Sequence, residues 1–410
     1  MRMRNSFQLS PEQQLLRDSV DRFVSAHFSF EQWRAAAARR PSFDRALWSR
    51  MAEMGWLGIG ISEEAGGTGA DIGDALIAME GMGRGLVPAP YLGSVVLAGQ
   101  ILDGCTSPAG RQLLQAMMRG EALACVAHAE PGSSFDAVEP STRARPEGDS
   151  FVLSGRKRHV LDADSADEMI VSACVEGAGA ADGGAADGGA ADGGAADGGA
   201  AALFIVPRAA TGVHRRDFRG ADGRHVSDLH LHEVRVPASK LLASPPRAAA
   251  VLGRAFDYAI LASLAEALGC MSVLSERTLE YLKTRRQFGV TIGSFQVLRH
   301  RMADVAIACE EARSLLLYAA SLVDAAPSQR ANAVSAAKVR IGQLGTFVAK
   351  QAVQMHGAIG VTDELAVGHH FKRLMMIFAS FGGADDHLQR FAATREALQS
   401  QAAQPCVENA

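Results

Sequence analysis

The sequence is poor in cysteine, and its cysteines are not spaced as in a metal site or a disulfide framework. The 410 residues contain six, with no Cys-x-x-Cys pair and no histidine-rich neighbourhood around them: Cys105, Cys125, Cys174, Cys270, Cys309 and Cys406. This scatter argues against a zinc site, an iron–sulfur cluster or a disulfide framework. We therefore expect reduced thiols and a cytoplasmic protein.

A strong charge bias and a long hydrophobic run are also missing. The formal net charge is -4 and the pI is about 6.3, so no basic footprint for nucleic acid or an anionic membrane is present. The start "MRMRNSFQLS" is basic, but no apolar segment follows it as in a signal peptide. No uninterrupted, strongly hydrophobic stretch reaches the ~20 residues of a membrane span. The sequence predicts neither a nucleic-acid nor a membrane partner.

Aromatic residues are scarce too, at 6%, whereas apolar residues make up 48% of the chain. Abundant alanine and leucine favour helix over sheet, and the length predicts two or three packed units. The first unit is predicted to be an α-helical domain over 1–122. In "LSPEQQLLRDSVDRFV", Ser10 is placed to cap a helix, Pro11 to begin it and Gln13 to complete a capping box. Two more helices are expected in "FDRALWSRMAEMG" and "DALIAMEGMGRGL".

The pattern changes over 123–240 to short apolar or alternating runs, which predict a central β domain. These runs are "ALACVAHAE", "SFVLSGRKRHV", "DEMIVSAC", "AALFIVP" and "VSDLHLHEVRVP". Between the third and fourth lie four copies of a five-residue unit, "AADGG", with no side chain larger than alanine among its apolar members. Such a segment buries too little surface to offset its ordering entropy, so 177–202 is predicted to be a disordered loop between two strands.

Helical periodicity returns over 241–400 in four amphipathic segments, 248–283, 295–324, 329–356 and 363–400, with Ser294 and Pro327 at joints. Short connections predict an antiparallel four-helix bundle, followed by a flexible tail at 401–410.

One stretch of this bundle, "YLKTRRQFGVTIGSFQVLRHRMAD", resembles the acyl-CoA dehydrogenase family. The resemblance extends to "LSPEQQLLRDSV", "GWLGIGISEEAGGTG", "AHAEPGSSFD" and "QAVQMHGAIGV", and so covers essentially the whole chain. It implies a mainly α fold with a middle β domain: an N-terminal α-helical domain, a central β-barrel and a C-terminal antiparallel four-helix bundle. It also implies FAD as the cofactor, an acyl-CoA substrate, a homo- or hetero-tetramer and an electron-transfer flavoprotein as acceptor.

In that family FAD lies across a subunit interface. Carried over by position, Arg285 and Phe288 would contact the diphosphate, Gln296 would assist, and Gln354, Gly357 and Gly360 would form the dinucleotide turn of a neighbouring subunit. An arginine fork matches phosphate oxygens, and glycine lets the backbone approach closely. Alternatively, Arg285 is a solvated cation at a helix end and Gly357 a helix cap.

The half of the flavin site on the β domain departs from the family pattern. The resemblance assigns flavin contacts to Ala129, Ser134, His159 and Leu161. Ala129 replaces the usual threonine, Phe135 intrudes in the same loop, and Leu161 replaces a threonine whose hydroxyl orients the flavin. The side chains of Ala129 and Leu161 cannot form hydrogen bonds. His159 either stacks on a ring or is a partly exposed strand residue.

The family reaction is α,β-dehydrogenation of an acyl-CoA thioester, in which a carboxylate removes the α proton. The usual glutamate position falls on Gly383 and an alternative position on Ala259, so neither carries a base. Glu266 lies about 10 Å further along its helix and is expected to be a buried structural acid paired with an arginine. Asp257 faces elsewhere.

The carboxylates nearest Gly383 are Asp385 and Asp386, which we expect to cap the last helix rather than act as bases. His387 is a base in principle, but as a first-turn residue it is expected to point away from the flavin. The backbone N–H of Gly383 is left as a group that could polarise a thioester carbonyl.

Three hypotheses follow. In the first, the chain is a subunit of the kind found as the small subunit of the pimeloyl-CoA dehydrogenase type; it completes the FAD site of a large partner subunit that carries the glutamate. In the second, it is a self-sufficient homo-oligomer with an unconventional base. In the third, it is a flavin-free scaffold of the same fold.

Overall fold

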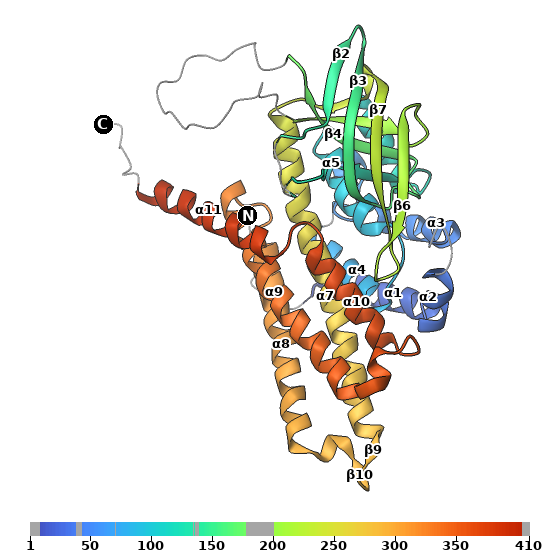
Figure 1. Cartoon of the computed structure of the whole chain (residues 1–410), viewed down its shortest axis with the longest axis vertical. Coiled ribbons are helices and arrows are strands. Elements are labelled where there is room, and N and C mark those ends of the chain that lie inside the picture. The colour runs from blue at the N-terminus through green and yellow to red at the C-terminus, as the bar shows by residue number, and fades with distance from the viewer. Residues whose placement is uncertain are drawn as a thin grey trace.

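The computed structural model describes residues 9–37, 43–69, 71–133, 135, 139–177 and 201–403. Helices open the chain, a sheet follows, and long helices close it (Figure 1). The N-terminal helices are α1 (Pro11–His27), α2 (Phe30–Ala37), α3 (Arg45–Glu53), α4 (Ile72–Arg84), α5 (Gly99–Asp103) and α6 (Pro108–Met118). A π-helical segment, η3 (Tyr91–Ala98), precedes α5.

The predicted start of α1 is confirmed. Ser10 is the N-cap, Pro11 follows it, and the side chains of Ser10 and Gln13 exchange hydrogen bonds with each other's backbone N–H groups. Sequence patterns did not indicate α2, η3, α5 or α6. All eight residues of η3 are buried, so the segment has no polar face from which a helical period could be recognised.

The middle of the chain forms one mixed eight-stranded sheet. Its strands are β1 (Ala124–Ala127), β2 (Arg143–Glu147), β3 (Ser150–Leu161), β4 (Glu168–Val175), β5 (Ala201–Pro207), β6 (Val213–Arg219), β7 (His225–Pro237) and β8 (Leu241–Ala243). They follow the order β6-β7-β3-β2-β4-β5-β8, with β1 parallel to β4. Within the described residues the two ends of this order, β6 and β8, are not paired, so the predicted barrel is not closed by hydrogen bonds.

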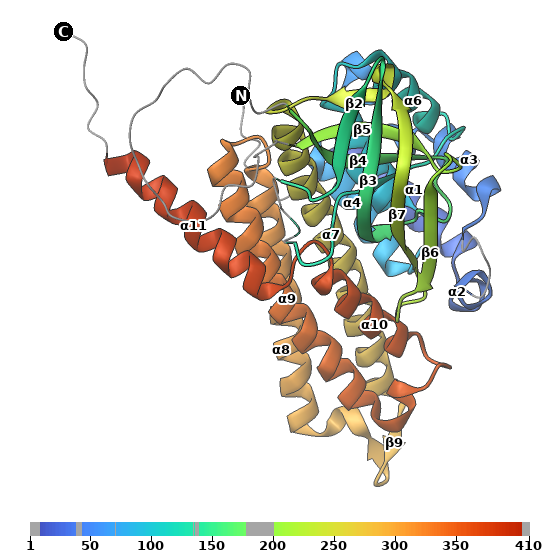
Figure 2. The ribbon, with the colours of Figure 1, turned by 45° about the horizontal axis from the view of Figure 1, so that its top comes forward.

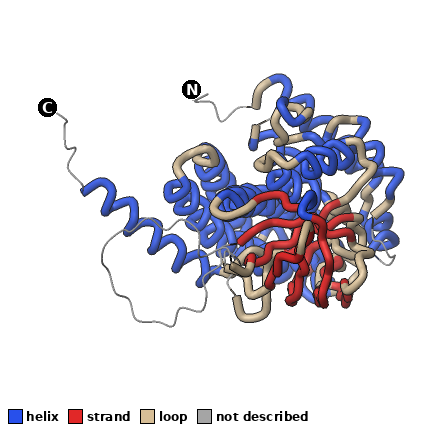
Figure 3. The backbone as a smooth tube through the Cα atoms, turned by 90° about the horizontal axis from the view of Figure 1, so that it is seen from above, coloured by secondary structure: helices blue, strands red, loops and turns tan. Residues whose placement is uncertain are grey.

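The two faces of the sheet pack in different ways. Ile170, Leu203 and Ile205 join the helical core, whereas the alternating residues Val171 and Phe204 join a second core formed by the sheet itself. Figure 3 shows the strands gathered on one side of the molecule with helices behind them. Because both faces of β4 and β5 are buried, the sequences of these strands are continuous hydrophobic runs without alternation.

Three strands, β2, β6 and β8, were not predicted. In β2 and β6 most side chains are exposed or only partly buried, and β8 has three residues, so none shows a hydrophobic alternation. The predicted repeat loop falls almost wholly on 178–200, outside the described residues; the strands on either side of it, β4 and β5, are antiparallel partners.

The C-terminal helices are α7 (Arg247–Thr284), α8 (Gln296–Ser321), α9 (Pro327–His356), α10 (Ala366–Ala379) and α11 (Ala384–Ala403). The predicted fourth segment, 363–400, is therefore two helices rather than one, because the chain leaves helical geometry over 380–383. Gly382 has φ +91° at this break. A small hairpin, β9 (Arg286–Gln287) with β10 (Val290–Thr291), joins α7 to α8. Figure 2 shows α11 extending away from the helical body; it runs three residues past the predicted boundary at 400, and 404–410 lie outside the described residues.

The core of the bundle is α7. It is the one described helix that is long and apolar enough to span a membrane, but 89% of its most apolar window is buried inside the protein. Packing against α4, α9, α8 and α10 accounts for that burial, as in the central helix of a helical domain. All five described cysteines are free thiols, and four of them are buried.

Candidate active site

A pocket of about 500 Å³ lies between the β domain and the loop that joins α10 to α11. Its β-domain wall contains His128, Ala129, Glu130, Arg158, His159 and Leu161, and its opposite wall contains Met376, Phe381, Gly382, Gly383 and Asp386. The structure thus brings together the predicted positions Ala129, His159, Leu161 and Gly383. The remaining β-domain position, Ser134, lies outside the described residues.

Glu130 anchors the β-domain wall. Its carboxylate accepts hydrogen bonds from the backbone and hydroxyl groups of Ser141 and Thr142 and from the ammonium of Lys157, at 2.6 Å. Burial acts to raise the pKa of Glu130, but the charge and hydrogen bond of Lys157 and these hydroxyls lower it to about 2. Glu130 is therefore a fixed anion that holds the loop, not a base.

Lys157 also connects the anchor to His128. It is fully buried, and its Nζ donates to Glu130, to the carbonyl of His128 at 3.2 Å and to the hydroxyl of Ser172 at 3.0 Å. Ser172 Oγ lies 2.9 Å from His128 Nδ1. Sequence analysis did not single out His128, although it directly precedes Ala129 in the same loop.

The opposite wall is held together by aromatic rings. Phe135 of the β-domain loop lies 4.8 Å, between ring centroids, from His387 of α11 and covers Gly382, where any Cβ would overlap its ring. Phe381 lies 6.0 Å from Phe256 of α7. Gly382 is therefore required twice, by its positive φ and by this close approach.

His387 does not face the pocket. It is fully buried, its Nε2 donates to the Phe381 carbonyl at 2.9 Å, and its Nδ1 lies 3.2 Å from Ser335 Oγ. Burial lowers the pKa of His387 to about 4. It is a structural residue of the α10–α11 junction.

Gly383, the position that the family resemblance implies for the usual glutamate, lies in the pocket wall. A Cβ added there meets only Asp386 Oδ2, at 3.8 Å, within 4 Å. The Gly383 N–H, considered above as a group that could polarise a thioester carbonyl, donates instead to Asp386 Oδ2 at 2.8 Å. Asp386 lines the pocket and lies in the first turn of α11, from which its carboxylate accepts the N–H of Gly383, the residue that precedes the helix.

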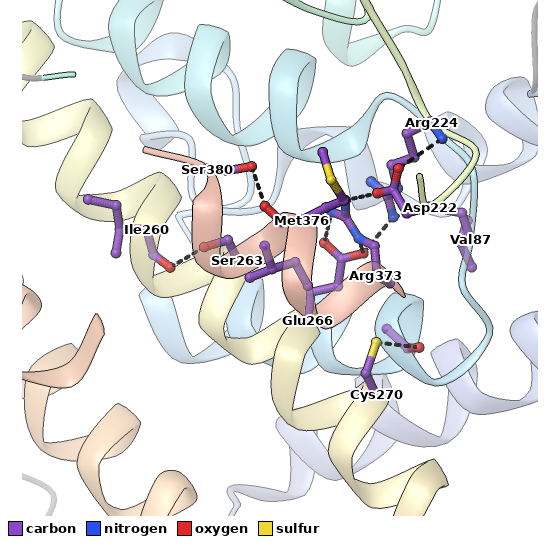
Figure 4. A network of polar contacts seen from close by, with 12 residues as sticks. Val87, Asp222, Arg224, Ile260, Ser263, Glu266, Cys270, Arg373, Met376 and Ser380 are labelled. Atoms are coloured by element: carbon purple, nitrogen blue, oxygen red, sulfur yellow. Dashed lines mark hydrogen bonds and ion pairs between the residues drawn. The ribbon is translucent and has the colours of Figure 1, made fainter. Parts of the chain in front are cut away.

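Two other acids near this region, Asp257 and Glu266, are committed to ion pairs. Ala259 is fully buried and carries no base; the neighbouring Asp257 binds Arg330 at 2.8 Å and Arg390 at 2.7 Å. Glu266 is fully buried between two arginines, Arg224 of the β6–β7 turn and Arg373 of α10 (Figure 4). The prediction of a structural acid paired with arginine is confirmed.

A buried lysine holds the end of α10. Lys338 of α9 donates to the carbonyls of Ile377, at 2.7 Å, and Ser380, at 2.8 Å, just before the Phe381–Gly383 loop. Burial and the nearby charge of Arg373 lower the pKa of Lys338 to about 7. These contacts satisfy carbonyls that a helix end leaves without intrahelical partners.

The second group of predicted cofactor residues lies elsewhere. Arg285, at the end of α7, and Phe288, between β9 and β10, lie at the end of the bundle remote from the sheet (Figures 1 and 2). Gln296 begins α8, and Gln354, Gly357 and Gly360 lie at the end of α9 and in the turn after it. Arg285, Phe288, Gln296 and Gln354 are exposed, Phe288 by 89%.

These residues do not join the pocket within one chain. Gly357 caps α9 with φ +68°, so the helix-cap interpretation is confirmed, while its cofactor role stays a prediction. Arg285 is likewise the exposed C-cap of α7. The separation of the two groups means that a site formed from both needs a second chain.

Two family profiles match most of the helical parts of the chain. Residues 10–121 match the N-terminal domain of acyl-CoA dehydrogenases, and residues 249–397 match the C-terminal domain. The chain belongs to the acyl-CoA dehydrogenase family. The family consists of oxidoreductases that are flavoproteins and that typically form tetramers.

Known proteins resemble the chain over 80% or more of its length. The probable acyl-CoA dehydrogenase YngJ of Bacillus subtilis is 28% identical over 96% of this chain and 100% of its own. The caffeyl-CoA reductase-Etf complex subunit CarC of Acetobacterium woodii is 27% identical over 80% of this chain and 84% of its own. A chain of the ChsE4-ChsE5 complex from Mycobacterium tuberculosis superposes with a TM-score of 0.81 and 27% identity, covering 98% of this chain and 100% of that one. The chain thus has the fold of the acyl-CoA dehydrogenase family over nearly its whole length.

The pocket has the size and chemistry to take a flavin ring. Its volume falls in the range of ~300–1,000 Å³ typical of small-molecule sites. Its lining combines apolar side chains such as Leu97, Val126 and Leu161 with the side chains of Arg158 and two histidines. The residues present therefore fit the cofactor that the family uses.

Proposed function

We propose that this acyl-CoA dehydrogenase works as a subunit of a heteromeric enzyme, in which it completes a partner's FAD site and does not itself remove the α proton. The assembly would carry out FAD-dependent α,β-dehydrogenation of an acyl-CoA thioester. We further propose that the chain corresponds to the small subunit of the pimeloyl-CoA dehydrogenase type, acting in the cytoplasm.

The observation that carries the proposal is that the two predicted base positions carry no acid and that the carboxylates lining the pocket among the described residues, Glu130 and Asp386, are already engaged. Gly383 and Ala259 have no acid, Glu130 is bound by Lys157, Asp257 and Glu266 are each held by two arginines, and Asp386 accepts the Gly383 N–H. A general base needs a carboxylate that can reach the substrate and gain a proton. Carboxylates stabilised by ion pairs resist protonation.

The neighbour-facing residues support the role in a partner's site. Arg285 carries a fork of donors suited to a diphosphate, and its exposure at the bundle end leaves it accessible to another chain. Bound FAD supplies the acceptor for the hydride that leaves the β carbon. In this scheme the partner's glutamate takes the α proton, while Arg285, Gln296 and Gln354 of this chain hold the dinucleotide.

Assembly with other proteins is supported by the relatives. One similar structure is a complex of two different proteins, ChsE4 and ChsE5, and one similar sequence is a subunit of a complex with Etf. We therefore propose a hetero-tetramer with a large acyl-CoA dehydrogenase subunit and an electron-transfer flavoprotein as the electron acceptor.

A self-sufficient enzyme is the alternative, favoured by the place of Asp386 in the pocket wall. The two proposals differ in the activity of the lone chain. The purified chain is to be assayed for flavin absorbance and for ferrocenium reduction with a panel of acyl-CoAs, alone and with a co-expressed dehydrogenase that has an intact glutamate. We expect turnover only in the complex; robust turnover by the lone chain that is abolished in Asp386→Asn would overturn the subunit proposal.

A further inference from the structure

A second pocket, of about 380 Å³, lies where the three domains of the chain meet. Its walls come from α2 of the N-terminal domain, from the turn between β6 and β7, and from α10 with the turn before it (Figures 1 and 2). It shares no lining residue with the pocket beside Gly383. Small-molecule sites occur preferentially at such junctions between domains.

Basic side chains from all three walls line this second pocket. Arg34 comes from α2 and Arg219 from the end of β6, while His369 and Lys372 come from the first two turns of α10. Arg34 lies 5.9 Å from the centre of the Phe30 ring. Within the described part of the chain, the guanidinium groups of Arg34 and Arg219 form no hydrogen bond and no ion pair. Two exposed positive charges are therefore available to an anion.

Asp222, one of the two acids in the lining, does not neutralise these charges. It is 8% exposed, and its Oδ2 binds Arg373 Nη1 at 2.7 Å inside the protein (Figure 4). Its Oδ1 accepts the backbone N–H of Arg224 at 3.2 Å. Both oxygens of this carboxylate are thus engaged, and the buried Arg373 balances its charge.

Asp363, the other acid, is bound only loosely. It lies 3.3 Å from Lys372 Nζ and 3.7 Å from His369 Nε2, but 76% of its side chain is exposed. Ion pairs between exposed side chains contribute little free energy. An incoming anion can therefore compete with Asp363 for Lys372.

Aromatic packing fixes His369 in the pocket wall. Its ring centroid lies 4.6 Å from that of Trp33, which is 7% exposed and lines the same pocket, and 5.3 Å from that of Phe30. Burial lowers the pKa of His369, so its imidazole is neutral at pH 7 and adds no charge. Trp33 gives the pocket an intrinsic fluorescent reporter.

We propose that this pocket binds a small phosphorylated molecule through Arg34, Arg219 and Lys372. The two guanidinium forks match phosphate oxygens, and the ammonium adds a third positive charge. A phosphate monoester carries about 1.5 to 2 negative charges at pH 7, which suits three cations better than the single charge of a carboxylate. The volume of the pocket lies near the lower end of the ~300–1,000 Å³ range of small-molecule sites. The inference does not rest on the proposed function, because the site uses none of the residues assigned to the flavin.

The first experiment is a calorimetric titration of the full-length chain in a phosphate-free buffer with pyrophosphate, with ADP and with malonate as a dicarboxylate control. We expect both phosphates to bind, to change the tryptophan fluorescence and to bind more weakly as salt is added, because exposed charges are screened. Tighter binding of ADP than of pyrophosphate would support a nucleotide as the ligand, and equal or weaker binding would support the phosphate groups alone. Binding of neither, or binding of malonate as tightly as pyrophosphate, would overturn the inference.

Substitutions then test the residues of the site. Arg34→Gln and Arg219→Gln should each weaken pyrophosphate binding by roughly tenfold, the effect of one lost charge-assisted contact. The matched control is Arg156→Gln, which changes an exposed arginine of β3 outside this pocket and should bind like the wild type. Thermal unfolding of each variant should match that of the wild type, since all three arginines are exposed.

Asp363→Asn provides a test in the opposite direction. It removes the anion that competes for Lys372, so pyrophosphate should bind roughly threefold more tightly, in line with the strength of an exposed ion pair. A partly unfolded variant would not show such a gain. Weaker binding by Asp363→Asn, or wild-type affinity in both arginine variants of the pocket, would contradict the site. The same results would leave the subunit proposal unaffected, since that proposal is tested by the activity of the lone chain.

Discussion

Glu266 and Arg373 form a bidentate ion pair inside the protein, with Nη2–Oε2 at 2.6 Å and Nε–Oε1 at 2.8 Å. The same carboxylate accepts Arg224 Nη2 at 2.5 Å, and Arg373 also binds Asp222 at 2.7 Å (Figure 4). Arg224 and Asp222 come from the turn between β6 and β7, Glu266 from α7 and Arg373 from α10. One buried cluster thus fixes the sheet to the helix that leads into the Phe381–Gly383 loop.

Glu266→Gln should destabilise the protein by about 3–5 kcal/mol, because it removes the anion that the buried Arg373 and the partly buried Arg224 share. The matched control is Glu276→Gln, which removes an exposed partner of Arg84 and should cost at most about 1 kcal/mol. Denaturant unfolding of the three proteins gives both values. Equal losses in the two variants would show that burial does not determine the strength of the Glu266 cluster.

Gly383→Glu should give the lone chain a base and therefore some acyl-CoA dehydrogenase activity. The position has room for a side chain, and its φ is not in the left-handed region. Gly383→Gln is the control of equal size without a titratable group. Ferrocenium reduction with acyl-CoA substrates measures the gain; activity in neither variant, when both bind FAD, would indicate that the altered β-domain wall is what limits the reaction.

Arg285→Ala should leave the stability of the chain unchanged. It should weaken the affinity of the complex with the partner subunit for FAD by about tenfold or more, and so lower the FAD content of that complex. The residue is exposed, so little packing is lost, whereas a charge-assisted contact to a diphosphate is removed. The neighbouring Arg286→Ala is the control, since Arg286 Nη2 donates to the Gly289 carbonyl of its own hairpin. Flavin released by denaturing each complex is quantified; unchanged content in Arg285→Ala would contradict the role.

The free energy of unfolding should fall as the pH falls from about 6.5 to about 4, because buried histidines stay neutral in the folded state while the same residues become protonated in the unfolded chain. Burial lowers the pKa of His370 and that of His387 to about 4, so in this window the unfolded state binds more protons than the folded state. Burial raises the pKa of Asp162 to about 6, which acts in the opposite direction.

A single variant isolates the histidine contribution. His387→Gln keeps a donor for the Phe381 carbonyl but cannot titrate, so its free energy of unfolding should depend less on pH between 6.5 and 4 than that of the wild type. Urea unfolding at several pH values measures the two slopes. Identical slopes would mean that His387 is protonated alike in the folded and unfolded states.

Lys338 should make the free energy of unfolding depend on pH above about 7. Burial and Arg373 lower the pKa of Lys338 to about 7, whereas the unfolded lysine titrates near ~10.4. Between these values the unfolded state binds more protons, so this residue's contribution to stability rises with pH from about 7 to about 10. Lys338→Met should remove that rise, measured again by urea unfolding, and should also loosen the end of α10 that Lys338 holds.

Much of the helical fold was predictable because its signals are local. The cap formed by Ser10 and Gln13 and the joint at Pro327 depend on neighbouring residues alone, and the pairing of Glu266 with arginine was expected because it lies on the buried side of a long helix. The short or exposed strands β2, β6 and β8 were missed because pairing with distant strands, rather than their own pattern, makes them strands.

The site was predictable in position but not in detail. That Gly383 lacks a base was visible in the sequence, whereas the donation of its N–H to Asp386 depends on the geometry of the α11 first turn. The relation between Lys157, Ser172 and His128 joins residues up to 44 positions apart, and no local pattern links them. These residues come together only when the strands pair into the sheet.

The pairing of β4 with β5 has a practical meaning for the repeats between them. Cys174 and Ala201 are register partners, so the chain leaves the sheet and returns to it at adjacent strand positions, roughly 5 Å apart. The number of residues inserted there can grow or shrink without moving any strand. This makes the β4–β5 connection a suitable position at which to insert an epitope, a fluorophore or a whole fused domain.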